Sequence, residues 1–191
     1  MSFDARQRQQ LLSLARESIG AGLSTRTRIP FSASAIDVGL EVPRATFVTL
    51  RIEGQLRGCC GSLEAQQSVA EDVWRNAWAS AFSDPRFPPL SADEYPRCDL
   101  HVSVLSELEP LIVSDEAQLL RELQPGVDGL LLKAGMSQAT FLPAVWQQLP
   151  NPGEFVRQLK LKAGWRSDSW PADARVYRYT TESFGERSDS E

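Results

Sequence analysis

Apolar and polar residues recur along this chain with two different periods, which together predict a mixture of helices and strands. A spacing of three to four residues is typical of an amphipathic helix, and alternation or a short apolar run is typical of a strand. The helical pattern covers residues 4–23, 68–82 and 151–164, with shorter helices expected at 91–95, 114–123 and 143–149. The strand pattern covers residues 47–52, 56–60, 100–108, 126–135 and 174–184.

The order of these elements predicts an α+β fold. Helices and strands follow one another without the βαβ rhythm of a parallel sheet, and the clearest pair of strands is a hairpin over 47–60 with its turn at Glu53 and Gly54. We therefore expect a largely antiparallel sheet flanked by helices. The length of 191 residues fits a single domain, placed here at 5–184, with a flexible acidic tail over 185–191.

Composition narrows the class of protein. The hydrophobic share of 42% and the charged share of 24% are ordinary for a globular protein. A net charge of −5 argues against nucleic-acid binding, and no apolar run is long enough to cross a membrane. The first residues lack the apolar core of a signal peptide, and three cysteines make a poor disulfide framework. These features predict a cytoplasmic protein.

The stretch "QLRGCCGSLEA", residues 55–65, is the clearest candidate for chemistry. In a regular strand the side chains alternate, so Leu56 and Cys60 would point into the core while Arg57 and Cys59 would share the other face. Arg57 would then lie about 6 to 7 Å from Cys59, where its charge favours a thiolate.

Other interpretations of the same residues stay open. The glycines could mark a bulge, with Arg57 solvated and Cys59 inert. A disulfide between the adjacent cysteines would strain the backbone and suit an oxidising compartment. Cys98 and His101 form C-x-x-H and invite a zinc site with Cys59 and Cys60, but an offset of three places the first two on opposite faces of a strand. We expect no metal site.

Several stretches of the chain resemble the AMMECR domain family, whose bacterial members are called AmmeMemoRadiSam system protein A. The hairpin "FVTLRIEGQLRGCCGSLEA" resembles the family's signature, an L-R-G-C-x-G motif. Further similar stretches follow in the family's order: "NAWASAFSDPRFPPLS", "VSVLSELEPL", "GVDGLLL", "TFLPAVWQQLP", "EFVRQLKLKAGW" and "VYRYTTESF". The resemblance covers nearly the whole chain.

This resemblance implies two unequal lobes with the L-R-G-C hairpin lining a cleft between them. The residues that it assigns to the cleft are Leu56, Arg57, Gly58, Cys59, Gly61, Asp84, Arg86 and Phe87. Cys60 departs from the family pattern, where an aliphatic residue follows the motif cysteine. The family has no established activity and implies no cofactor. Its association with a Memo-like protein and a radical-SAM enzyme implies partners in a shared pathway.

Two functional hypotheses follow. In the first, the chain is a binding or accessory module whose hairpin docks a partner protein or small ligand, and Asp84 with Arg86 forms an ion pair at its rim or a clamp for the proline-rich turn. In the second, it is an enzyme or enzyme subunit in which Cys59 is a thiolate nucleophile or redox group stabilised by Arg57. The sequence favours the first, because the sole histidine, His101, lies outside the family motif.

Overall fold

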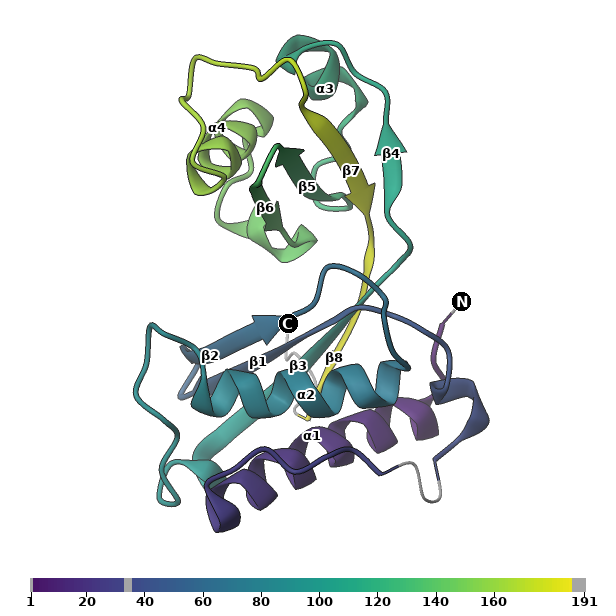
Figure 1. Ribbon diagram of the computed structural model, residues 1–191, viewed down its shortest axis with the longest axis vertical. Helices are drawn as coiled ribbons and strands as arrows, with labels where there is room; N and C mark the ends of the chain where they lie inside the picture. The colour runs from purple at the N-terminus through teal and green to yellow at the C-terminus, as the bar shows by residue number, and fades with distance from the viewer. Residues whose placement is uncertain (1, 33–35, 187–191) are drawn as a thin grey trace. The chain divides into compact units, whose positions relative to one another are not determined.

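The computed structural model describes residues 2–32 and 36–186, which form two compact units (Figure 1). The first unit holds the described residues up to Leu105 together with those from Glu182, and the second is Ser106–Thr181. Each unit has its own four-stranded sheet and its own hydrophobic core. The chain therefore has the helix-and-antiparallel-sheet content of the predicted α+β fold, which is confirmed.

The sheet of the first unit has the strand order β2-β1-β3-β8, and β1 runs antiparallel to both of its neighbours. Its strands are β1 (Thr46–Ile52), β2 (Gln55–Gly61), β3 (Cys98–Leu105) and β8 (Thr181–Gly185). Two long helices, α1 (Ala5–Thr25) and α2 (Val69–Phe82), and two short 3₁₀ helices, η1 (Val38–Leu40) and η2 (Tyr95–Arg97), complete the unit.

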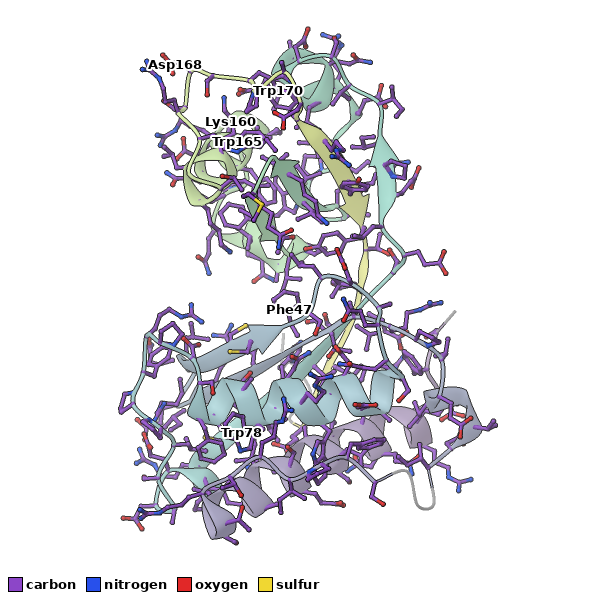
Figure 2. The ribbon with its side chains drawn as sticks, in the orientation of Figure 1. Phe47, Trp78, Lys160, Trp165, Asp168 and Trp170 are labelled. Carbon is purple, nitrogen blue, oxygen red and sulfur yellow. The ribbon has the colours of Figure 1, made fainter. Side chains whose placement is uncertain are left out.

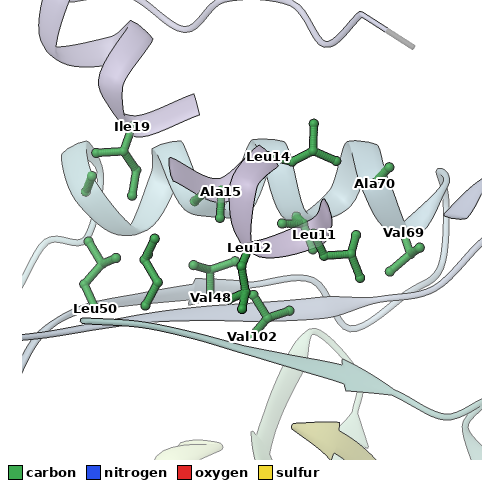
Figure 3. Close-up of a cluster of buried hydrophobic side chains, with 14 of the residues drawn as sticks. Leu11, Leu12, Leu14, Ala15, Ile19, Val48, Leu50, Val69, Ala70 and Val102 are labelled. Atoms are coloured by element: carbon green, nitrogen blue, oxygen red, sulfur yellow. The ribbon is translucent and has the colours of Figure 1, made fainter. Parts of the chain in front are cut away.

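Both long helices pack on one face of this sheet, as Figure 3 shows. Alternate residues of β1, including Val48 and Leu50, are fully buried in one core with the apolar residues of α1 and α2. The helices begin where capping residues predict: the Asp4 carboxylate accepts a hydrogen bond from the Gln7 N–H in a capping box, and the Ser68 hydroxyl caps α2. Residues on the other sheet face are only partly buried.

The sheet of the second unit has the order β4-β7-β5-β6 and is antiparallel throughout. Its elements are β4 (Glu109–Leu111), α3 (Glu116–Glu122), β5 (Gly129–Ala134), β6 (Ser137–Phe141), η3 (Pro143–Gln147), α4 (Pro152–Lys162) and β7 (Arg175–Tyr179). In its core the Trp146 ring stacks on Phe155 with centroids 3.8 Å apart. Lys160 on α4 is buried, and its Nζ pairs with Glu116 of α3 at 2.6 Å (Figure 2).

The structure corrects several predicted elements. The segment at 174–184 is two strands, β7 and β8, that belong to different sheets, and β4 and β6 were not predicted. The helix expected over 114–123 is α3, and Asp115 caps it, because the Asp115 carboxylate accepts the Gln118 N–H at 2.7 Å. The predicted helix at 143–149 is the 3₁₀ helix η3. The helix predicted at 91–95 is wrong: residues 92–94 form a turn, and η2 begins only at Tyr95.

The tail predicted over 185–191 is described only at its first two residues. Gly185 ends β8, and Glu186 pairs with Arg16 of α1 at 2.5 Å, whereas residues 187–191 of the predicted tail lie outside the described residues. The single domain over 5–184 stays a prediction. Within the described part of the chain, no helix combines the length and hydropathy needed to cross a membrane.

The approach of β2 to α2 depends on Gly58. A Cβ added there would lie 2.1 Å from the Ser80 carbonyl oxygen, a backbone atom that cannot rotate away. We expect Gly58→Ala to lower the free energy of unfolding by about 2–3 kcal/mol, as overpacking does, measured by urea denaturation. The control is Gly20→Ala in α1, where the nearest atom is the Tyr95 hydroxyl at 3.3 Å. Equal stability of the two variants would contradict this account.

Candidate functional site

The candidate site is built on the hairpin of β1 and β2. Glu53 and Gly54 form its two-residue turn with φ angles of 52° and 77°, the left-handed conformation that such tight hairpins require. The turn was predicted at these two residues, and it is confirmed. It places β2 at the edge of the sheet, beside β1 only.

A bulge interrupts the pairing of β2 at Arg57. Gly58 lies opposite Leu50, but Leu56 lies opposite Arg51, so Arg57 is one extra residue in the strand. Residues paired across antiparallel strands point to the same face, so Leu56 joins the face opposite the helices. It is 37% exposed, and the prediction that Leu56 points into the core is wrong.

The two adjacent cysteines lie on different faces of the sheet. Cys60 lies opposite Val48 of the core, and Cys59 lies opposite Thr49 on the outer face. This confirms the predicted faces of the two cysteines, although Cys60 is only half-buried. Burial raises the pKa of the Cys60 thiol, and the negative charge of Asp84 adds to the effect. Both cysteines are free thiols, so they form no disulfide.

The thiol of Cys59 has a hydrogen-bond donor beside it. The Thr49 hydroxyl donates to Cys59 Sγ at 3.4 Å. His101 of β3 lies opposite Thr49 on its other side, so the three residues form a row across β2, β1 and β3. Cys98, on the same strand as His101, is buried on the core face, which separates the C-x-x-H pair as expected.

Arg57 is held by an ion pair that the sequence did not reveal. Its Nε and Nη2 atoms donate to the two carboxylate oxygens of Glu94 at 2.7 and 2.9 Å, and Nη2 also donates to the Pro88 carbonyl at 3.0 Å. This bonding raises the pKa of Arg57 and lowers that of Glu94 to about 2. Only 11% of the Arg57 side chain is exposed, so the interpretation of Arg57 as solvated is wrong.

Asp84, two residues beyond the end of α2, closes the free edge of β2. Its buried carboxylate pairs with the Arg86 guanidinium at 2.7 Å and accepts the Cys59 N–H at 2.9 Å. Arg86 in turn donates to the Cys59 carbonyl at 3.3 Å. The pair thus bonds both backbone groups of Cys59 as a neighbouring strand would. The Arg86 guanidinium holds the pKa of Asp84 far below its usual range.

Aromatic rings complete this surface. The Phe87 ring lies near two cations, with its centroid 5.8 Å from Arg57 Cζ and 5.6 Å from Arg86 Cζ. Phe47 of β1 covers Gly61, since a Cβ on Gly61 would lie 2.3 Å from its ring (Figure 2). Because Gly61 has no side chain, the Phe47 ring can pack directly on its backbone.

The structure thus brings the predicted site residues together within the first unit. Leu56, Arg57, Gly58, Cys59 and Gly61 lie on β2, and Asp84, Arg86 and Phe87 lie just after α2. The predicted ion pair of Asp84 and Arg86 is confirmed, and it also clamps the turn. That these residues line a cleft stays a prediction. Sequence reasoning missed Thr49 and the bond of Glu94 to Arg57.

The described residues include no cluster of three His, Cys, Asp or Glu side chains that could hold a metal ion. Ionic groups at the site are instead paired with one another. The arrangement is therefore a rigid, hydrogen-bonded surface that displays Leu56 and the Cys59 thiol.

Comparisons with known proteins identify the family of this chain and agree with its α+β fold. The model of the AMMECR1 family matches residues 12–184, and the chain belongs to this family. A protein of Methanothermobacter thermautotrophicus is 36% identical over 145 residues, covering 75% of this chain and 76% of that protein. A protein of Thermotoga maritima is 38% identical over 140 residues, covering 72% and 75%.

A solved structure is also similar. The crystal structure of an uncharacterized protein from Pyrococcus horikoshii matches with a TM-score of 0.88 and 31% sequence identity. The match covers 96% of this chain and 93% of that one.

The pair of Arg57 and Glu94 makes stability depend on pH. Because the pKa of Glu94 is lowered from 4.5 to about 2, its contribution is complete above pH 4.5 and is lost as the pH falls toward 2. With allowance for partial exposure, we expect Glu94→Gln to cost about 1–2 kcal/mol at pH 7 and nothing near pH 2. Urea denaturation from pH 7 to pH 2 measures this difference.

Asp93→Asn is the matched control, since Asp93 is an exposed neighbour on the same segment. It should stay close to the wild type over the same pH range. A gap between Glu94→Gln and the wild type that is constant with pH would contradict the assigned role of the ion pair.

Proposed function

We propose that the chain is a binding module whose docking surface is formed by β2 and residues 84–87. Its partners would be a Memo-like protein and a radical-SAM enzyme, the proteins with which bacterial members of the family are associated. The observation that carries the proposal is the bonding of Arg57. A guanidinium that is bound to Glu94 and to the Pro88 carbonyl fixes the shape of the surface and is unavailable for chemistry.

The groups left exposed support docking. Leu56 is one of the few large apolar side chains exposed in the described chain, and the Arg86 side chain is 54% exposed while still paired with Asp84. Arginine and large apolar side chains are the residue types that anchor protein interfaces. A surface already fixed by buried hydrogen bonds loses little conformational entropy when a partner binds.

This proposal predicts that Leu56 matters more to binding than the Cys59 thiol. Leu56→Asp should weaken the affinity for the partner at least about tenfold, as loss of an interface anchor does, whereas Cys59→Ser should stay within about twofold. Isothermal titration calorimetry with the purified Memo-like and radical-SAM proteins measures both.

Ile112→Asp is the control, because Ile112 is 88% exposed and lies in the second unit. Its affinity should equal that of the wild type. If neither partner protein binds the wild-type chain, the named partners are wrong. If Cys59→Ser abolishes binding while Leu56→Asp does not, the docking surface is wrong.

A second candidate function is thiol chemistry at Cys59, as a nucleophile or redox group of an enzyme. The specific observation in its favour is the hydroxyl of Thr49, which donates to Cys59 Sγ at 3.4 Å. A donor to sulfur stabilises the thiolate form, and it is the thiolate that reacts. His101 on the far side of Thr49 adds a titratable group to the same row.

The second candidate predicts selective alkylation. Iodoacetamide should label Cys59 faster than Cys60 or Cys98, because burial raises the pKa of both other thiols. Thr49→Val should slow labelling of Cys59 about threefold through loss of one hydrogen bond. Peptide mass spectrometry against pH measures the three rates.

The control is Ser103→Ala on β3, where the hydroxyl bonds Ser183 rather than a cysteine. It should leave the rate at Cys59 unchanged. Labelling of Cys59 that is slow and insensitive to Thr49→Val would remove the support for thiol chemistry and leave the docking function.

A further inference from the structure

The first unit carries a groove that lies outside the docking surface proposed above. It has a volume of about 630 Å³, within the range of sites that bind small molecules. The end of α1, the C-terminal half of α2 and the segment at 89–92 form its walls. Its lining residues are Gly22, Leu23, Arg26, Trp78, Phe82, Pro89, Leu90, Ser91 and Ala92.

The floor of the groove is aromatic because Gly22 lacks a side chain. A Cβ on Gly22 would lie 2.5 Å from the Phe82 ring and 2.9 Å from the indole of Trp78. The two rings lie against each other on α2 with centroids 5.6 Å apart. Figure 2 shows Trp78 on the side of α2 that faces α1. Such a floor suits a flat or linear apolar group.

One polar group in this floor has no protein partner. The indole N–H of Trp78 is buried and finds no hydrogen-bond acceptor among the described residues. Trp74, one turn earlier on α2, donates its own indole N–H to the Ile29 carbonyl at 2.9 Å. Buried donors are normally paired, but this nitrogen has almost no accessible surface, so a ligand in the groove does not bond to it. The N–H still serves as a reporter of occupancy, because Trp78 lines the groove.

A cation stands at the edge of the same groove. Arg26 ends α1 in a left-handed conformation with φ of 57°, and its backbone N–H donates to the Gly22 carbonyl. This bond keeps Arg26 next to the glycine that faces Trp78. The Arg26 side chain is exposed and forms no ion pair within residues 2–32 and 36–186. A cation at the edge of an apolar groove favours a ligand with an anionic headgroup and an apolar body.

Hydrogen bonds from Arg57 and to Glu94 fix the wall formed by residues 89–92. Arg57 donates to the carbonyls of Pro88 and Pro89, and Glu94 accepts the Ser91 N–H at 2.9 Å. Leu90 is buried, and its N–H bonds the Ala81 carbonyl of α2. The groove therefore exists before any ligand arrives.

We propose that this groove binds a small apolar carboxylate, such as an aryl-alkanoic acid. The carboxylate pairs with the Arg26 guanidinium, and the apolar body packs on Leu23, Phe82 and Leu90 beside Trp78. The inference goes beyond the proposed docking function and does not depend on it, because Leu56 and Cys59 do not line the groove.

The test uses 4-phenylbutyrate as the probe and the full ¹⁵N-labelled chain. The resonance of the Trp78 indole N–H, assigned with Trp78→Phe, is followed by NMR during titration. We expect it to shift with 4-phenylbutyrate, and we expect 4-phenylbutanol and 4-phenylbutylamine to bind at least about fivefold more weakly, because they lack the anion. An unmoved Trp78 resonance, or equal affinity for acid and alcohol, would overturn the proposal.

Matched variants separate the headgroup contact from the apolar contact. Arg26→Gln should raise the Kd for 4-phenylbutyrate about fivefold, whereas Arg28→Gln should not, since Arg28 lies outside the groove. Ala92→Trp should block the exposed rim, whereas the neighbouring Asp93→Trp should not. Unchanged affinity in both Arg26→Gln and Ala92→Trp would place the ligand elsewhere and overturn the site. Partner binding, measured separately through Leu56→Asp, tests the docking function independently.

Discussion

The hairpin site depends on the close approach of one strand to one helix. With no side chain on Gly58, β2 comes near enough to α2 for the Cys60 N–H to donate to the Ser80 hydroxyl at 2.8 Å. The same approach brings Asp84, just beyond the end of α2, to the free edge of β2. A bulkier residue at position 58 would separate the strand from the helix and break both contacts at once. The glycine of the L-R-G-C motif, Gly58, is therefore needed first of all for the packing of β2 against α2.

The charged residues of the site mainly hold β2 against neighbouring segments through ion pairs. Arg57 joins β2 to Glu94 and the proline-rich turn, and Asp84 joins the same strand to Arg86. A largely buried ion pair gains little net stability, because desolvation offsets most of the attraction, but removal of one partner leaves a buried charge. Such pairs therefore specify geometry more than they add stability. This division of roles leaves Leu56 and the Cys59 thiol as the groups that the surface presents.

The sequence predicted the features that depend on residues close to one another along the chain. The helices over 4–23 and 68–82 and the turn at Glu53 and Gly54 depend on residues within four positions of one another, and the structure has them close to where they were predicted. The partner of Arg57 lies 37 residues away, so nothing in the local pattern could reveal it. The division of residues 174–184 between two sheets is likewise decided by strands distant in sequence.

The bulge at Arg57 changes which side chains of the L-R-G-C motif share a face of the sheet. Strict alternation would place Arg57 beside Cys59 and turn Leu56 inward, and this arrangement would couple the guanidinium to the thiol. The bulge inserts Arg57 between two correctly paired residues, Leu56 and Gly58, so the strand resumes its register with Leu56 on the face of Cys59. Arg57 is then directed to Glu94. The motif therefore separates a structural arginine from an apolar group and a thiol that share one exposed face, and this separation favours recognition over charge-assisted catalysis.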